Sequence, residues 1–81
     1  MRITVKLFAI LRDRAGVSEF PLDLERGSAT SVALELIATR YAAIKDLLPR
    51  AALAINQEYV PRDSPLNDGD ELALIPPVSG G

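Results

Sequence analysis

The sequence contains no cysteine, no histidine and no tryptophan. Without cysteine the chain has no disulfide, no thiolate nucleophile and no cysteine metal ligand, which suits a reducing compartment. Without histidine it has no imidazole base and no histidine metal ligand. The two absences exclude nucleophile–base pairs built on histidine, so we expect no catalytic side chain of the usual kind.

An excess of positive charge and a long apolar run are also missing. Nine basic residues are scattered among eleven acidic ones, giving a net charge of −2, which argues against a general nucleic-acid binder. No apolar run approaches the roughly 20 residues that span a membrane, and the first residues alternate instead of forming a signal peptide. With 81 residues, 48% of them hydrophobic, the chain is expected to form one cytoplasmic domain.

Two strands are predicted in the first third of the chain. Residues 2–8 and 18–24 alternate apolar and polar side chains, as half-buried strands do. They are expected to pair with each other, and Pro21 predicts that the second lies at a sheet edge because proline donates no hydrogen bond. Residues 9–14 are either a helical turn or the end of the first strand, and Gly16 marks a turn.

A helix is predicted from about Ser31 to Ala42, with the hydroxyl of Thr30 or Ser31 as its cap. A second, shorter turn follows at residues 44–48 and ends at Pro49. The buried face of the main helix stays open, because two sets of residues fall at helical spacing. One set is Val32, Leu36, Ile37 and Tyr41, and the other is Ala33, Ile37 and Ile44.

Three short strands are predicted in the second half, at residues 53–55, 59–60 and 71–75. In the last of them Leu72 and Leu74 face inward, and Leu66 is expected to enter the core from the loop before it.

Acidic residues cluster at the turn before the last strand. Asp68, Asp70 and Glu71 surround Gly69, which can adopt a positive φ. A turn accounts for these acids better than a calcium or magnesium site, because the other ligands of an EF-hand loop are absent. We therefore expect no metal.

The last six residues cannot extend the sheet. Pro76 and Pro77 have no backbone N–H, so the strand must end at Ile75. Fully extended, the six residues reach about 20 Å, and the final two lack side chains that would obstruct a nucleophile or a narrow channel. The sequence predicts a domain at 1–75 and an extended, flexible tail at 76–81, with the Gly81 carboxylate as the reactive group. A frayed end without function is the alternative.

Several motifs resemble the MoaD/ThiS family of ubiquitin-like sulfur carriers, and especially the small subunits of molybdopterin synthase. They are Ala54-Ile55-Asn56-Gln57, Pro65-Leu66, Asp68-Gly69-Asp70-Glu71 and the closing Pro76-Pro77-Val78-Ser79-Gly80-Gly81. The resemblance spans the whole chain. It implies an α+β, ubiquitin-like β-grasp fold, in which a mixed sheet of about five strands packs on one main helix. The first and last strands lie side by side in the middle of that sheet.

The resemblance also implies a mechanism. An enzyme of the MoeB type uses ATP to adenylate the Gly81 carboxylate, and a sulfurtransferase then converts it to a thiocarboxylate. The tail, from Pro76, Pro77, Val78 and Ser79 to Gly80, inserts into a MoaE-type large subunit, in a heterotetramer of two small and two large subunits. There the sulfur passes to cyclic pyranopterin monophosphate. The chain itself binds no cofactor stably and supplies no catalytic side chain.

Four residues are candidates for the partner interface. Strand parity places Phe8 and Ile75 on the face away from the predicted core, and Tyr59 can join them. Arg12 matches a basic residue at the family's interface. The alternative is that single exposed apolar or basic residues are ordinary.

Other functions are compatible with the same sequence. A carrier of the ThiS or Urm1 type would deliver sulfur to thiamine, cysteine or tRNA thiolation. A ubiquitin-like modifier would end with Gly81 in an isopeptide bond, and a plain β-grasp binding module would have an inert tail.

Overall fold

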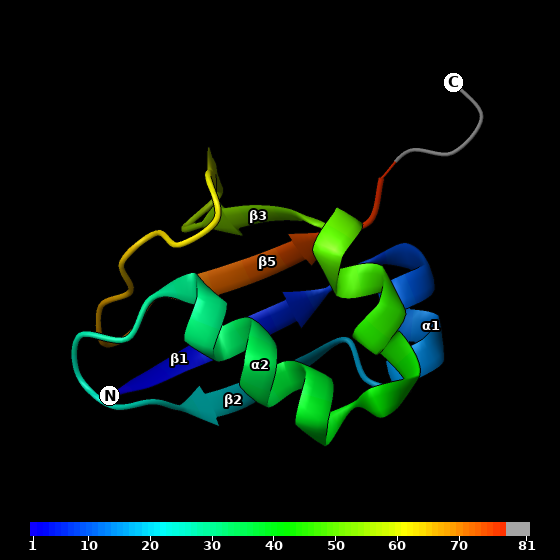
Figure 1. Ribbon diagram of the computed structural model, residues 1–81, viewed down its shortest axis with the longest axis horizontal. Helices are drawn as coiled ribbons and strands as arrows, with labels where there is room; N and C mark the ends of the chain where they lie inside the picture. The colour runs from blue at the N-terminus through cyan, green and yellow to red at the C-terminus, as the bar shows by residue number, and fades with distance from the viewer. Residues whose placement is uncertain (78–81) are drawn as a thin grey trace.

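In the computed structural model, which describes residues 1–77, the strands form one mixed sheet. The strands are β1 (Arg2–Leu7), β2 (Glu19–Asp23), β3 (Ala52–Ile55), β4 (Glu58–Val60) and β5 (Glu71–Ile75). Their order is β2-β1-β5-β3-β4; β1 and β5 run parallel at the centre, and the other neighbours are antiparallel (Figure 1). The first and last strands therefore lie side by side, which confirms the β-grasp prediction. Pro21 lies on the edge strand β2, as predicted.

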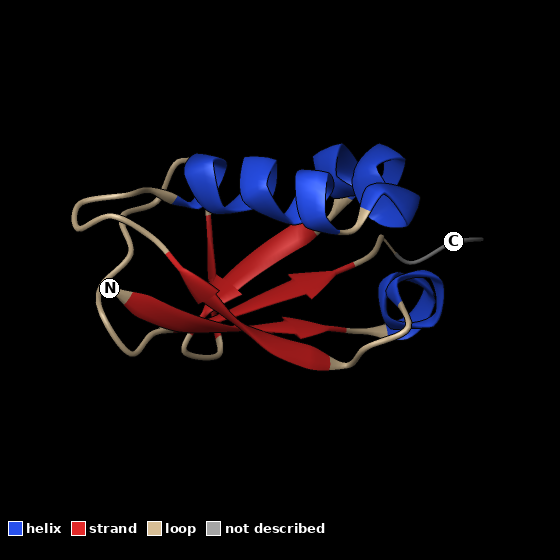
Figure 2. Cartoon of the chain, turned by 90° about the horizontal axis from the view of Figure 1, so that it is seen from below, coloured by secondary structure: helices blue, strands red, loops and turns tan. Residues whose placement is uncertain are grey.

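The helices cover one face of this sheet. α2 (Thr30–Arg40) and the 3₁₀ helix η1 (Ala42–Arg50) lie over that face, whereas α1 (Ala9–Ala15) lies beyond the end of the strands (Figure 2). Of the two alternatives for residues 9–14, the helical one is correct. Among residues 1–77, no helix is long and apolar enough to cross a membrane. The opposite face of the sheet is left without a helix in the described part of the chain.

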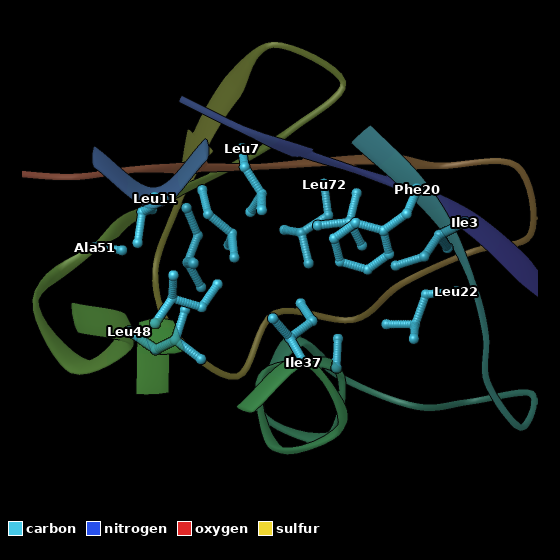
Figure 3. Close-up of a cluster of buried hydrophobic side chains, with 14 of the residues drawn as sticks. Ile3, Leu7, Leu11, Phe20, Leu22, Ile37, Leu48, Ala51 and Leu72 are labelled. Carbon is cyan, nitrogen blue, oxygen red and sulfur yellow. The ribbon is translucent and has the colours of Figure 1, made fainter. Parts of the chain in front are cut away.

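The core fills the space between the sheet and the helices (Figure 3). On β1 and β5 every second residue points into it, because side chains alternate along a strand. Its largest fully buried side chains include Ile3, Leu7, Leu11, Ile37, Ile44, Leu72 and Leu74. Leu66 is also buried, which confirms its predicted role as a plug. Burying each such side chain stabilises the fold by about 1.5–3 kcal/mol.

The structure decides which face of α2 is buried. Ala33 and Ile37 are fully buried, whereas Val32 and Leu36 remain 40% and 41% exposed. The set containing Val32 and Leu36 was therefore the wrong alternative. Neighbouring positions on a helix are about 100° apart, so two overlapping apolar stripes compete, and only contact with the sheet selects one.

The predicted cap of α2 was wrong. Ala29 is the capping residue, and no side chain caps the helix. The buried Thr30 hydroxyl instead accepts a hydrogen bond from the Ser64 N–H at 3.0 Å, and the Thr30 N–H donates to the Ser64 carbonyl at 2.9 Å. This reciprocal pair ties the long loop before β5 to the start of α2, so the hydroxyl serves tertiary structure.

Replacing Thr30 with valine should lower the free energy of unfolding by about 1–3 kcal/mol, because the buried Ser64 N–H loses its acceptor. Chemical denaturation would measure the change. Thr39→Val is the matched control: its exposed hydroxyl donates to the Glu35 carbonyl on the same helix, and its change should stay within about 0.5 kcal/mol. Equal effects of the two substitutions would contradict the role given to Thr30.

The turn before β5 is held by internal hydrogen bonds. Gly69 has a φ of 85°, as predicted. The Asp70 carboxylate accepts from the Asn56 side-chain amide at 3.0 Å and from the Asn67 N–H at 2.7 Å. The Asn56 side-chain oxygen in turn accepts from the Glu71 N–H at 3.0 Å. Within residues 1–77 no three acidic side chains gather as a metal site would require. These bonds fix where β5 begins, and with it the face on which Glu71 lies.

Candidate functional site

The tail leaves the sheet at Ile75. This residue pairs with Ala52 of β3, and the strand assignment stops there, before Pro76 and Pro77. Figure 1 shows the chain departing at the end of the sheet where α1 and η1 lie. The candidates Val78, Ser79, Gly80 and Gly81 lie outside the described residues. The division into a domain at 1–75 and a tail at 76–81 therefore stays a prediction.

A row of residues crosses the helix-free face of the sheet next to this root. Lys6 lies opposite Ala73, Ala73 opposite Ala54, and Ala54 opposite Tyr59. Facing side chains on paired strands are near neighbours, so two alanines form a low floor in the middle of the row. Tyr59, which is 74% exposed, stands beside that floor.

The floor and its walls enclose a shallow depression of about 250 Å³, which we call the outer hollow. Its lining residues are Lys6, Phe8, Ala54, Gln57, Tyr59, Glu71, Ala73 and Ile75. Phe8 is 43% exposed and Ile75 is half-buried. The structure thus brings three of the four predicted interface residues to one place at the root of the tail. An exposed apolar surface of this kind is typical of interaction sites.

Arg12 is not part of the outer hollow. It lies on α1, exposed, with its Nε 3.6 Å from a carboxylate oxygen of its neighbour Asp13. Its backbone N–H lies 3.5 Å from the Phe8 carbonyl, one helical turn earlier, so it is near Phe8 along the chain but does not line the outer hollow with Phe8, Tyr59 and Ile75. The partner role of all four residues remains a prediction.

Sequence reasoning missed two charged residues of the outer hollow. The Lys6 ammonium lies 3.0 Å from a Glu71 carboxylate oxygen, with 37% and 28% of the two side chains exposed. The hydrogen bond and charge of Glu71 raise the pKa of Lys6, and the charge of Glu19 adds to the effect. Strand parity could have found both residues, because Lys6 lies two positions before Phe8 and Glu71 four before Ile75.

A larger depression of about 550 Å³ lies on the helix side, between α2 and η1. Leu34, Ala38, Leu48 and Pro49 contribute its apolar lining, and Glu35, Lys45 and Arg62 its charged lining. One guanidinium nitrogen of Arg62 donates to the carbonyls of Leu48, Pro49 and Ala51 at 2.7–2.9 Å. The last carbonyls of a helix have no partner within the helix. Arg62 therefore stabilises the end of η1 by donating to them.

Comparison with known proteins supplies the family. The ThiS family model matches residues 5–81. The molybdopterin synthase sulfur carrier subunit of Chlamydomonas reinhardtii is 43% identical over 83 residues, covering 100% of both chains. Among solved structures, SAMP1 from Haloferax volcanii has a TM-score of 0.91 at 28% identity, covering 100% of both chains.

A second solved structure is a complex of subunits 1 and 2 of the molybdopterin-converting factor from Helicobacter pylori. The chain matched in it has a TM-score of 0.72 at 26% identity, again covering 100% of both chains. The comparisons of sequence and of structure point to the same kind of protein. The chain therefore belongs to the ThiS family, among the molybdopterin synthase sulfur carrier subunits.

Proposed function

We propose that this protein carries sulfur for molybdenum cofactor biosynthesis as a thiocarboxylate on Gly81. The main support is the alignment with the algal carrier subunit, which runs through the full length of both chains; the family model likewise extends to residue 81. The matched region thus extends through Gly80 and Gly81. The absence of cysteine and histidine leaves no side chain of the usual kind to hold the sulfur instead.

The chemistry follows from the weakness of a carboxylate as an electrophile. In the proposed first step, an adenylating enzyme of the MoeB type joins the Gly81 carboxylate to the α-phosphate of ATP and releases pyrophosphate. The outer sulfur of a persulfide on a sulfurtransferase then attacks the acyl adenylate and displaces AMP, and a second thiol cleaves the resulting acyl disulfide, leaving the thiocarboxylate on Gly81 and a disulfide on the donor side. In the large subunit this sulfur passes to cyclic pyranopterin monophosphate. ATP is consumed by the activating enzyme, and no stably bound cofactor of this chain is needed.

In this scheme the folded domain is the part of the protein that the partner recognises. The outer hollow lies where the tail begins, so a partner that binds it receives the tail in a defined direction. The Helicobacter pylori complex of two subunits supports a large subunit as that partner. We extend the proposal to a heterotetramer of two small and two large subunits. A cytoplasmic location belongs to it as well, since activation consumes ATP.

Mass spectrometry tests the proposal directly. The protein is incubated with its adenylating enzyme, ATP and a sulfur source, and we expect a mass increase equal to the exchange of one oxygen for one sulfur. Transfer to the large subunit with its pterin substrate should then restore the original mass. An unchanged mass after the first step would defeat the proposal, and sulfur transfer to a thiazole synthase alone would reassign the carrier to the thiamine route.

A protein modifier is the second candidate. It is favoured by the likeness to a Haloferax volcanii structure named small archaeal modifier protein 1, with a TM-score of 0.87 at 26% identity. A modifier would join the activated Gly81 to lysine amines of other proteins. Blots of cell extracts for conjugates of higher mass would separate the two candidates, because a carrier forms none.

A further inference from the structure

The outer hollow has a floor of unusually small side chains. Ala54 and Ala73 are only 4% and 7% exposed although they lie on the helix-free face, because larger neighbours surround them. The walls are apolar on the Tyr59 side and on the side of Phe8 and Ile75. Apolar anchors that fill such depressions dominate binding energy in protein interfaces. The shape therefore fits one protruding apolar side chain of a partner.

The remaining wall is charged, and one further carboxylate lies just beyond it. Lys6 pairs with Glu71 at 3.0 Å and lies opposite Glu19 of the edge strand β2. One ammonium between two carboxylates leaves a net charge of −1. Farther along the same face, Arg2 and Asp23 form their own pair at 2.7 Å, which adds no net charge. Together with Glu19, which does not itself line the outer hollow, this side of the face is therefore acidic on balance.

Docking would remove water from this wall. Lys6 and Glu71 are both more than half buried already, and a charged group that loses its remaining water needs hydrogen bonds from the partner. The backbone of Glu71 is anchored, because its N–H donates to the Asn56 side-chain oxygen, and the Lys6 ammonium orients its carboxylate. The oriented Glu71 carboxylate lies near the uncompensated charge of Glu19, so a cationic group of the partner matches this part of the surface best.

From this geometry we propose that the Lys6–Glu71 pair, with Glu19, determines which partner the outer hollow accepts and in which orientation. The fitting partner presents an apolar side chain to the alanine floor and an arginine or lysine to Glu71. The inference rests on the proposed function, since the partner it concerns is the large subunit of molybdopterin synthase. It assigns specificity to residues that do not belong to the tail.

Calorimetric binding of the full chain to the large subunit of its own organism tests the inference. Glu71→Gln keeps the shape of the side chain and removes its charge; we expect about 10- to 100-fold weaker binding and a smaller dependence on salt. Glu58→Gln is the matched control, because it removes the same charge from β4 outside the lining of the outer hollow. Its affinity should stay within about threefold of the wild type. Tyr59→Ala serves as the positive control.

The exchange Lys6→Glu/Glu19→Lys/Glu71→Lys separates recognition from stability. It rebuilds the ion pair with reversed polarity and keeps opposite charges at the paired positions 6 and 19, so the melting temperature should stay near that of the wild type while the affinity falls. Wild-type values of both quantities would overturn the inference, and so would equal binding by Glu71→Gln and Glu58→Gln. If the wild type itself fails to bind the large subunit, the proposed function falls together with the inference. Wild-type binding that is unaffected by Glu71→Gln removes the inference alone.

Discussion

A variant carrying one additional alanine after Gly81 is expected to acquire no sulfur and to form no molybdopterin. The extra residue moves the carboxylate by about 3.5 Å and places a methyl group where the chain otherwise has none. A misplacement of about 1 Å can already lower a rate about 100-fold, so the loss should exceed that factor. Mass spectrometry detects the missing thiocarboxylate, and a coupled assay with the large subunit detects the missing product.

The control for this variant keeps the length of the tail. Ser79→Ala removes one hydroxyl and leaves the glycine end in place, so sulfur should still be acquired at a comparable rate. The melting temperature should be unchanged in both variants, because the core lies in residues of the folded domain. Molybdopterin formation by the extended variant without trimming would show that the carboxylate of Gly81 is not the working group.

Leu72→Ala should have the largest effect on stability. Leu72 is fully buried on β5, the strand between β1 and β3. Truncating a buried leucine to alanine lowers the free energy of unfolding by about 2–5 kcal/mol, because contacts are lost and a cavity remains. A loss of about 3 kcal/mol lowers the melting temperature of a domain of this size by about 12–24 °C. Thermal and chemical denaturation would both report it.

Leu36→Ala provides the matched control for this effect. It removes the same atoms from a side chain of α2 that is 41% exposed, so we expect a loss of less than about 1 kcal/mol. A similar loss for Leu36 would mean that the other apolar stripe of α2 faces the core. The comparison therefore also tests the helix orientation that sequence could not decide.

Local patterns predicted most elements of the fold correctly. The alternation in residues 2–8 and 71–75 predicted β1 and β5, and the Gly69 turn between hydrophobic segments was placed where the structure has it. These signals can be read from the sequence because they depend on the local backbone alone. Side chains alternate along any strand, and glycine tolerates a positive φ wherever it stands. The order of the strands came from family resemblance, since periodicity holds no information about pairing.

The errors share one physical origin. The cap assigned to Thr30 or Ser31 was wrong: the helix begins one residue earlier than predicted, and the Thr30 hydroxyl accepts from the N–H of Ser64, which is 34 residues away. The face of α2 was ambiguous because both apolar stripes satisfy helical spacing. Contacts between distant segments decided both cases, and no local pattern encodes them.

By itself, the sequence determined three features: the absence of cysteine and histidine chemistry, the end of the sheet before Pro76, and a tail that ends without side chains. All three depend on covalent structure alone. Only the tertiary structure decided that Lys6 and Glu71 form an ion pair and that two alanines meet between Phe8 and Tyr59. Those contacts depend on the register of β1, β5, β3 and β4, which is set by the packing of the whole core.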